Sequence, residues 1–163
     1  MSIDASYNFR KVTDSLTTSG IVHPDELKAL RSQGYEVVVN LLPDTSEHAV
    51  PDERKLVESQ GIEYVHIPVD FTQPTSADFL TFSGTLDRVH KKKVHVHCAA
   101  NYRVSAFYSL YLVSREVWNA EQAMEFVRSI WQPSEYPVWS EFISGTLAQF
   151  STHRGIQTDR GAG

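Results

Sequence analysis

The sequence contains a single cysteine, Cys98, so no disulfide can form within the chain. Disulfides belong to oxidising compartments, and their exclusion favours the reducing cytoplasm. No apolar run approaches the roughly 20 residues that a membrane-spanning helix needs, so we expect no membrane association. The first residues, MSIDASYNFRKV, lack the apolar core of a secretory signal, although a mature protein has already lost such a signal.

Positive charge is also scarce. Fifteen Lys and Arg residues stand against 20 Asp and Glu, which gives a formal net charge of −5. A protein that binds nucleic acid over a broad surface usually shows clustered basic residues, so we expect no nucleic-acid partner. The basic run at 91–93 lies at the N-terminal end of an expected strand, across the sheet from the site, and is expected to be a solvated edge. An anionic ligand would therefore be attracted by a local positive site and not by the overall field.

The length of 163 residues suits one domain, and a hydrophobic content of 41% is sufficient for a core. We find no internal repeat and no linker. The sequence predicts a single domain over 1–150, followed by a flexible tail over 151–163, which is polar and contains glycine.

Apolar segments alternate with amphipathic ones along the chain. The expected strands lie at 35–42, 62–68 and 91–98, with an edge strand or hairpin within 7–20. The expected helices lie at 24–33, 51–60, 76–90, 104–117, 119–131 and 137–150. This alternation predicts an α/β fold with a mostly parallel central sheet flanked by helices. Ligands bind past the carboxyl ends of the strands in such sheets, and Cys98 follows one of these ends.

The segment HCAANYRVS, residues 97–105, joins this strand to the next helix. Loop amides at a helix N-terminus have no helical partners, and with the helix dipole they form a site for phosphate or a similar oxyanion. The same field stabilises a thiolate, and an arginine can hold two phosphate oxygens at once. Cys98 is thus a candidate nucleophile, Arg103 a candidate phosphate ligand, and Ser105 a hydroxyl that could assist the departing sulfur. Alternatively, Cys98 is a small buried hydrophobic residue, the commoner role of a lone cysteine.

HCAANYRVS resembles the phosphate-binding loop of the protein tyrosine phosphatase superfamily: His-Cys, five residues, Arg, then Ser or Thr. VVNLLPD and GIEYVHIPVD, ahead of this loop, are similar to the small bacterial dual-specificity-phosphatase-like proteins. That group includes the phosphatase-like part of beta-lactamase-hydrolase-like proteins. The resemblance covers roughly residues 7–150. It implies a four-stranded parallel core sheet, a phosphocysteine intermediate, no metal or other cofactor, and a phosphorylated protein or small molecule as substrate.

The resemblance also implies roles for individual residues. An aspartate on a preceding loop protonates the leaving oxygen in this family; Asp70, in VDFTQPT, matches that position, and Asp44 is the second choice. His97 stands where the family uses a histidine to hold the loop by hydrogen bonding. The implied phosphate-binding residues are Ala99, Ala100, Asn101, Tyr102, Arg103, Val104 and Ser105.

The loop departs from the family pattern in two respects. Only four residues separate Cys98 from Arg103, whereas Ser105 is at the usual distance. Either Arg103 lies one position early in a loop of full length, which turns its side chain by about 100° at a helix start, or the loop is one residue shorter. Asn101 replaces the usual glycine, which is tolerable because asparagine adopts left-handed conformations more easily than most residues. Misplacement of a catalytic group can cost about a hundredfold in rate, so the sequence predicts a phosphatase with a weakened active-site loop.

Three alternatives stay open at this point. The displaced arginine is compatible with a catalytically impaired protein that binds phosphate or a phosphopeptide. A rhodanese-like sulfurtransferase would also carry its cysteine at a strand end, as a persulfide. His95 and His97 lie on the same side of a strand and could form half of a metal site, but no third ligand accompanies them.

Overall fold

The computed structural model describes residues 2–162, with side chains described for residues 2–152. The chain forms two compact units, residues 1–105 and residues 106–163. Their boundary falls within helix α4 (Tyr102–Ser114). Every residue that the sequence suggests for the site lies in the first unit.

A five-stranded sheet forms the centre of the first unit. Its strands are β1 (Arg10–Lys11), β2 (Leu16–Ser19), β3 (Val37–Asn40), β4 (Glu63–His66) and β5 (Val94–His97). Their order across the sheet is β1-β2-β5-β3-β4, and only the edge hairpin β1–β2 is antiparallel. The mostly parallel sheet, the edge hairpin and the four-stranded parallel core are thus confirmed.

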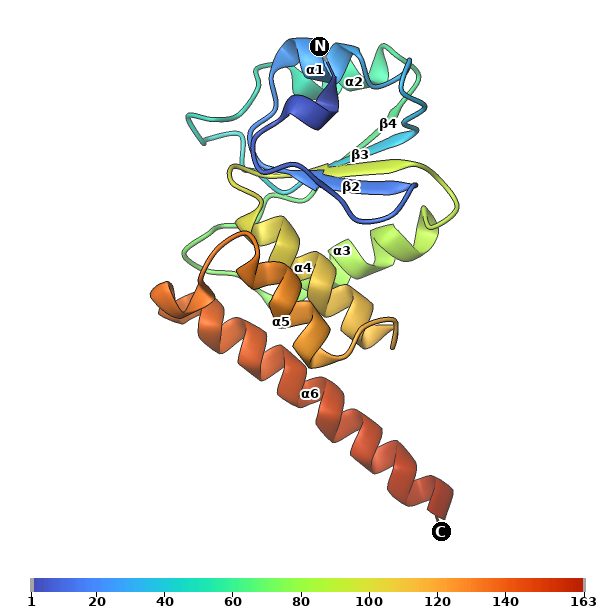
Figure 1. The fold of residues 1–163 in the computed structure, drawn as a ribbon, viewed down its shortest axis with the longest axis vertical. Coiled ribbons are helices and arrows are strands. Elements are labelled where there is room, and N and C mark those ends of the chain that lie inside the picture. The colour runs from blue at the N-terminus through green and yellow to red at the C-terminus, as the bar shows by residue number, and fades with distance from the viewer. Residues whose placement is uncertain (1, 163) are drawn as a thin grey trace. The chain divides into compact units, whose positions relative to one another are not determined.

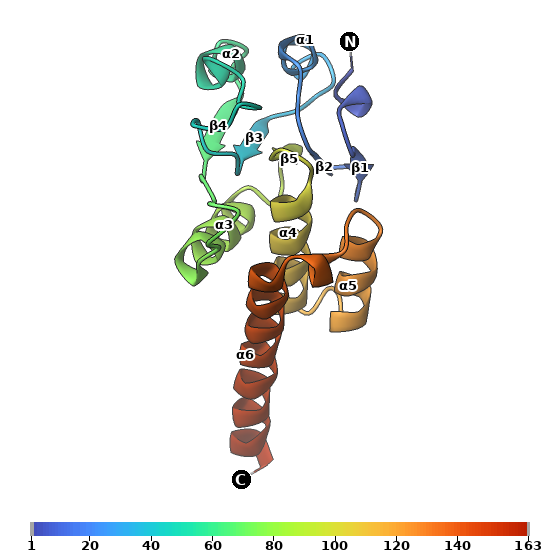
Figure 2. The same cartoon turned by 90° about the vertical axis from the view of Figure 1, so that its left-hand side faces the viewer.

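Helices cover both faces of this sheet. The short helix η1 (Ile3–Ala5) and the helices α1 (Pro24–Lys28) and α2 (Glu53–Glu58) lie over one face, and α3 (Ser76–Arg88) lies over the other (Figures 1 and 2). Helix α1 begins at Pro24, as the sequence predicts. The prediction that Pro51 begins the next helix is wrong, because α2 starts at Glu53 after an N-cap residue in the left-handed conformation, Asp52 (φ 57°).

The core beneath α1 and α2 is aliphatic. Val38 of β3 packs there with Leu27 and Leu30, and Val57 of α2 contacts the same cluster. All four side chains are fully buried. Each such side chain contributes about 1.5–3 kcal/mol through burial, so the sheet and these helices form a rigid base for the loops at the sheet edge.

The second unit is helical. It contains the part of α4 after residue 105, followed by α5 (Ala120–Arg128), η2 (Pro133–Glu135) and α6 (Pro137–Ala162). Trp131 and Trp139 are buried with their ring centroids 6.0 Å apart. In the described part of the chain no helix is both long and apolar enough to cross a membrane. The domain bounds of 1–150 and the flexible tail of 151–163 stay predictions.

Candidate active site

The carboxyl ends of the parallel strands meet at one edge of the sheet. Ser19, His97 and Asn40 are paired across β2, β5 and β3, and Asn40 is paired with His66 at the end of β4. Because β5 ends at His97 and α4 begins at Tyr102, Cys98 lies at a strand end, where the sequence analysis places it. Cys98 is 1% exposed.

The loop after Cys98 is attached to the rest of the unit through its carbonyl groups. Ala99 O accepts a hydrogen bond from the Ile21 amide at 2.8 Å, and Ala100 O accepts one from Asn8 Nδ2 at 3.0 Å. Within the described residues, five backbone amides here have no acceptor: those of Ala99, Ala100 and Asn101 in the loop, and those of Arg103 and Val104 in the first turn of α4. Since unpaired N–H groups at a helix N-terminus attract anions, this loop is suited to hold an oxyanion.

Asn101 gives the loop its turn. Its φ of 69° is left-handed, which confirms the expectation for a residue that replaces glycine. The buried side chain adds what a glycine could not, because its Nδ2 donates to Asn8 O and to Thr18 Oγ1, both at 2.9 Å. Asn101 therefore ties the loop to β2.

Gly20 permits the close approach of the loop, a role that the sequence analysis missed. A Cβ atom at this position would lie 2.5 Å from Ala99 O and 2.7 Å from the Ala100 Cα. Both are backbone atoms, so no side chain can move aside. Gly20 directly follows a strand, a position typical of close backbone approach, but the sequence does not reveal which segment approaches.

The guanidinium group of Arg103 is partly buried and lies within electrostatic range of Cys98 and Asp70. Its Nε and Nη1 are buried and have no hydrogen-bond partner in the described part of the chain. Its central carbon lies 5.3 Å from the centroid of the Phe71 ring. Burial lowers the pKa of Arg103, whereas the charges of Cys98 and Asp70 act in the opposite direction. Buried N–H donors of a charged group that lack acceptors destabilise the fold. This arrangement therefore favours the binding of an anion that accepts from them.

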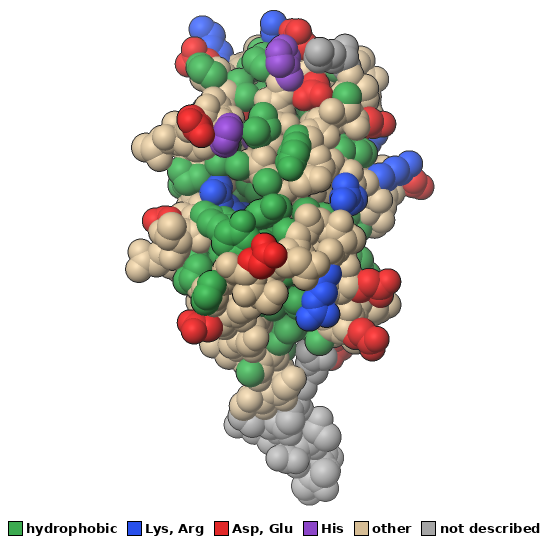
Figure 3. Space-filling view, turned by 60° about the vertical axis from the view of Figure 1, so that its left-hand side comes forward, with side chains coloured by type: hydrophobic (Ala, Val, Ile, Leu, Met, Phe, Trp, Pro, Cys, Tyr) green, Lys and Arg blue, Asp and Glu red, His purple; other side chains and the backbone are tan. Residues whose placement is uncertain are grey.

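The surroundings supply no broad positive field. On the face drawn in Figure 3, Lys and Arg side chains are scattered singly among acidic ones. With a net charge of −5, the attraction of an anion depends on the local donors of the loop and on Arg103.

Asp70 lies on the loop after β4, exposed to solvent. Its Oδ1 accepts hydrogen bonds from the Thr72 amide at 2.9 Å and from Thr72 Oγ1 at 2.8 Å. These two hydrogen bonds lower the pKa of Asp70, and the charge of Arg103 lowers it further by a smaller amount. The carboxyl group is thus within electrostatic reach of the candidate phosphate ligand and is ionised at neutral pH.

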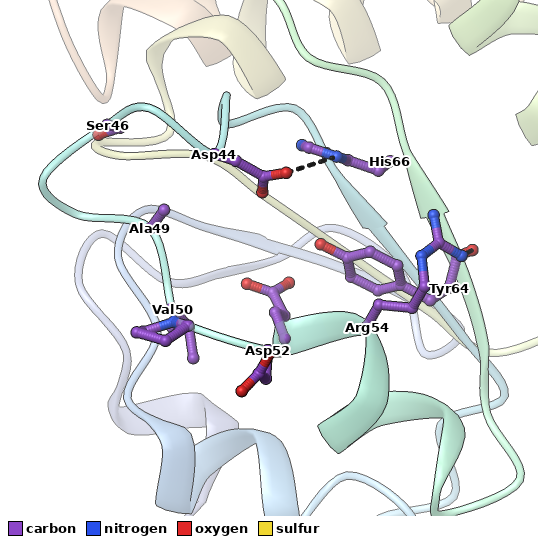
Figure 4. Close-up of a pocket in the computed structure, with 10 residues that line it drawn as sticks. Asp44, Ser46, Ala49, Val50, Asp52, Arg54, Tyr64 and His66 are labelled. Carbon is purple, nitrogen blue, oxygen red and sulfur yellow. Dashed lines mark hydrogen bonds and ion pairs between the residues drawn. The ribbon is translucent and has the colours of Figure 1, made fainter.

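Asp44, the second choice for the acid, belongs to a separate hollow. This hollow of about 490 Å³ is lined by residues from the loop after β3, from α2 and from β4, including Arg54 and Tyr64. Asp44 points towards His66, with 4.0 Å between its Oδ2 and Nδ1 of the histidine (Figure 4).

The remaining loop residues have mixed surroundings. Ser105 is buried; its amide donates to Asn101 O at 3.0 Å and its hydroxyl to Tyr102 O at 3.1 Å. The Tyr102 ring lies 6.2 Å from that of Phe71, the ring beside the Arg103 guanidinium. Val104 is fully buried and offers only its amide to a ligand.

The two histidines of β5 have different partners. His95 uses both ring nitrogens, for Thr17 Oγ1 and for Ser19 Oγ, each at 2.8 Å, which leaves none for a metal ion. His97 pairs through Nε2 with Glu53 Oε2 at 2.6 Å. The described residues contain no cluster of His, Cys, Asp or Glu able to hold a metal. The bond from His97 thus runs to α2, whereas the family pattern implies one that holds the loop.

The chain is similar to known proteins over most of its length. The phosphatase-like domain of beta-lactamase hydrolase-like proteins matches residues 8–115. A candidate phosphatase (DUF442) from Shewanella putrefaciens CN-32 is 35% identical over 91% of this chain and 96% of its own, with a TM-score of 0.81. The chain belongs to the phosphatase-like family of beta-lactamase hydrolase-like proteins. No curated protein matches this phosphatase-like protein in sequence.

More distant structures share the fold of this phosphatase-like protein. Tk-PTP, in its active form, is 22% identical over 86% of this chain and 97% of its own, with a TM-score of 0.70. TpbA of P. aeruginosa, solved with pTyr, is 16% identical over 88% and 90% of the two chains, with a TM-score of 0.68. The phosphatase-like protein therefore has the fold of the protein tyrosine phosphatase superfamily.

Proposed function

We propose that this phosphatase-like protein hydrolyses phosphate monoesters through Cys98. The observation that carries the proposal is that two sets of hydrogen-bond donors lack acceptors close to the cysteine in sequence. The buried, unpartnered Nε and Nη1 of Arg103 and the row of loop amides without acceptors belong to the same loop as the cysteine. A phosphoryl group has the charge and the several oxygens that such a set of donors requires.

The reaction has two displacement steps. The Cys98 thiolate attacks phosphorus, the bond from phosphorus to the leaving oxygen breaks, and Asp70 transfers its proton to that oxygen. Water then attacks the phosphocysteine, giving a proton to the Asp70 carboxylate, while the S–P bond breaks and inorganic phosphate and the thiolate are released. The loop amides and Arg103 stabilise the charge on the phosphoryl oxygens in both steps. Ser105 could donate its hydroxyl to the departing sulfur.

The general acid sets a direction for the pH dependence. The hydrogen bonds from Thr72 favour the ionised form of Asp70 and so lower its pKa. The carboxyl must be protonated to act as an acid, so its active fraction falls as the pH rises above this pKa. We therefore expect turnover to increase towards acidic pH, most clearly for substrates with poor leaving groups.

The substrate class we propose is a phosphorylated protein or small molecule, with phosphotyrosine as the first candidate. The Phe71 ring lies beside Arg103, with the Tyr102 ring 6.2 Å from it, and the ring of an aryl phosphate could stack there. The distantly related TpbA was solved with pTyr, which supports an aryl phosphate. The absence of any possible disulfide favours the cytoplasm as the place of action.

The test is turnover of p-nitrophenyl phosphate and a phosphotyrosine peptide between pH 5 and 8. We expect hydrolysis by the unmodified protein and none by Cys98→Ser. Ser114→Ala, at the far end of α4, is the control and should leave the rate unchanged. An unmodified protein that turns over neither substrate contradicts the proposal, as does a Cys98→Ser variant of undiminished activity.

One observation favours a second candidate, a protein that binds phosphate or a phosphopeptide without hydrolysing it. Cys98 is 1% exposed, so the sulfur is difficult for a bulky substrate to reach. Calorimetry with phosphate and a phosphotyrosine peptide distinguishes the two functions. Binding that survives Cys98→Ser, in a protein without turnover, supports this candidate, whereas no binding contradicts it.

A further inference from the structure

A buried hydrogen bond connects the residue before Cys98 to helix α2. His97 Nε2 and Glu53 Oε2 are 2.6 Å apart, and the two side chains are 2% and 4% exposed. Forty-four residues separate them in sequence. Removing a carboxylate from water is costly, and only well-placed hydrogen-bond partners offset that cost. A buried Glu53 carboxylate hydrogen-bonded to the residue before the candidate nucleophile therefore requires an explanation.

Other buried polar groups fix the position of the Glu53 carboxylate. Tyr64 of β4 is nearly buried, and its hydroxyl accepts a hydrogen bond from Asn40 Nδ2 at 2.9 Å. Burial is the largest cause of the raised pKa of Tyr64, and the charge of Glu53 is the second. Asn40 is held in turn, because its Oδ1 accepts the Leu42 amide at 2.8 Å. Side chains from three strands and from α2 therefore form one network around Glu53.

The hydrogen bond with Glu53 also places a proton on Nε2 of His97. A carboxylate can only accept, so Nε2 is the donor in this bond. The other nitrogen, Nδ1, is buried and has no partner among the described residues. A buried polar atom without a hydrogen-bond partner destabilises the fold, and a residue that served the core alone would avoid that cost. The network thus holds the imidazole in one orientation, immediately before the loop.

We infer that Glu53 is a positioning residue for Cys98. It acts through His97: the carboxylate fixes the imidazole, and the imidazole fixes the end of β5 from which the loop departs. The kinetic part of this inference rests on the proposed phosphatase function. Glu53 contacts no substrate in this account, so its removal should lower kcat more than it changes KM.

The experiment compares three substitutions on α2. Glu53→Leu removes the acceptor for His97, Glu53→Gln keeps an acceptor oxygen, and Glu58→Gln alters a half-exposed residue of the same helix as a control. Carboxylates that orient metal-binding histidines are typically worth about 10- to 100-fold in activity, and we take the same range for the carboxylate that orients His97. We expect a loss of that size in kcat for Glu53→Leu with KM little changed, recovery of most of it with Gln, and no change for the control.

A double-mutant cycle tests whether Glu53 acts through His97. In a His97→Asn background, Glu53→Leu should cost little more, because the group on which it acts is already gone. Full additivity would overturn the inference. The inference also fails if Glu53→Leu lowers the melting temperature but leaves kcat per folded molecule at the wild-type value, since that result describes a purely structural residue.

A second readout does not depend on turnover. Cys98 is the only cysteine in the sequence. Its alkylation by iodoacetamide, measured by mass spectrometry, therefore reports the accessibility and reactivity of this one thiol. We expect alkylation about tenfold slower in Glu53→Leu and close to wild type in Glu53→Gln. Equal rates in all variants would contradict the inference. A wild-type protein without turnover would contradict the proposed function alone, because the alkylation rates would still decide the role of Glu53. Should Glu53→Leu not fold, Glu53→Asp, which withdraws the carboxylate by one methylene, takes its place in both assays.

Discussion

Gly20→Ala provides a sharp test of the loop geometry. The added methyl group would lie 2.5 Å from Ala99 O and 2.7 Å from the Ala100 Cα, whereas ordinary contacts begin at 3.4 Å. The loop backbone would therefore have to retreat by about 0.9 Å, the difference between 3.4 Å and 2.5 Å. Overpacking of this kind costs about 1–3 kcal/mol in stability. A displacement of about 1 Å at a reacting group can cost about a hundredfold in rate.

The assay measures phosphate affinity, turnover of p-nitrophenyl phosphate and the free energy of unfolding in parallel. The matched control is Gly84→Ala on helix α3, where an added Cβ meets no atom within 4 Å. This control should raise stability by about 0.5–1 kcal/mol, the helix propensity gained over glycine, and leave turnover unchanged. Gly20→Ala should lose both turnover and phosphate affinity. Wild-type values of both in Gly20→Ala would refute the contact between the segment after β2 and the loop.

Three further predictions concern the site itself. Arg103→Lys should weaken phosphate binding by about 10- to 100-fold in calorimetry, since a lysine keeps the charge but cannot form the bidentate fork. Arg88→Lys on α3 is the matched control and should have no effect; an equal loss in both variants would contradict a specific role for Arg103. Asp70→Asn should lower kcat by about 10²- to 10⁴-fold and leave phosphate affinity intact; an unchanged kcat would remove Asp70 as the acid. Thr72→Val deletes a hydrogen bond that lowers the pKa of Asp70, so that pKa should rise and the fall of kcat with pH should move to higher pH; a pH profile identical to wild type would contradict this assignment.

The sequence predicts the fold well because its signals are local. Apolar runs such as VVVN and VHVH mark strands that are covered on both faces. Helix α1 ends at Lys28, earlier than the predicted end at 33, but it begins at Pro24 as predicted. Helix α2 is the exception: Pro51 resembles a first helical residue, but the left-handed Asp52 postpones the helix to Glu53. Local signals thus give the elements and leave their ends uncertain by a few residues.

The site could be predicted only where one segment carries it. Cys98, Asn101 and Arg103 are close in sequence, and the left-handed turn at Asn101 follows from residue type. The surroundings of the Arg103 side chain do not follow from residue type, because the guanidinium packs on Phe71, which lies over thirty residues earlier in the sequence. Long-range partners give no local signal, and Glu53 in particular reads as an ordinary charged residue in the first turn of a helix. Only the fold brings it to His97.

Trapping of the covalent intermediate tests the central claim most directly. The protein is mixed with p-nitrophenyl phosphate, quenched in acid within the first turnovers and digested for mass spectrometry. The account predicts one phosphoryl group on the peptide that contains Cys98, and none in Cys98→Ser. Hydrolysis that proceeds without phosphorylated Cys98, or with the phosphoryl group on another residue, would contradict it.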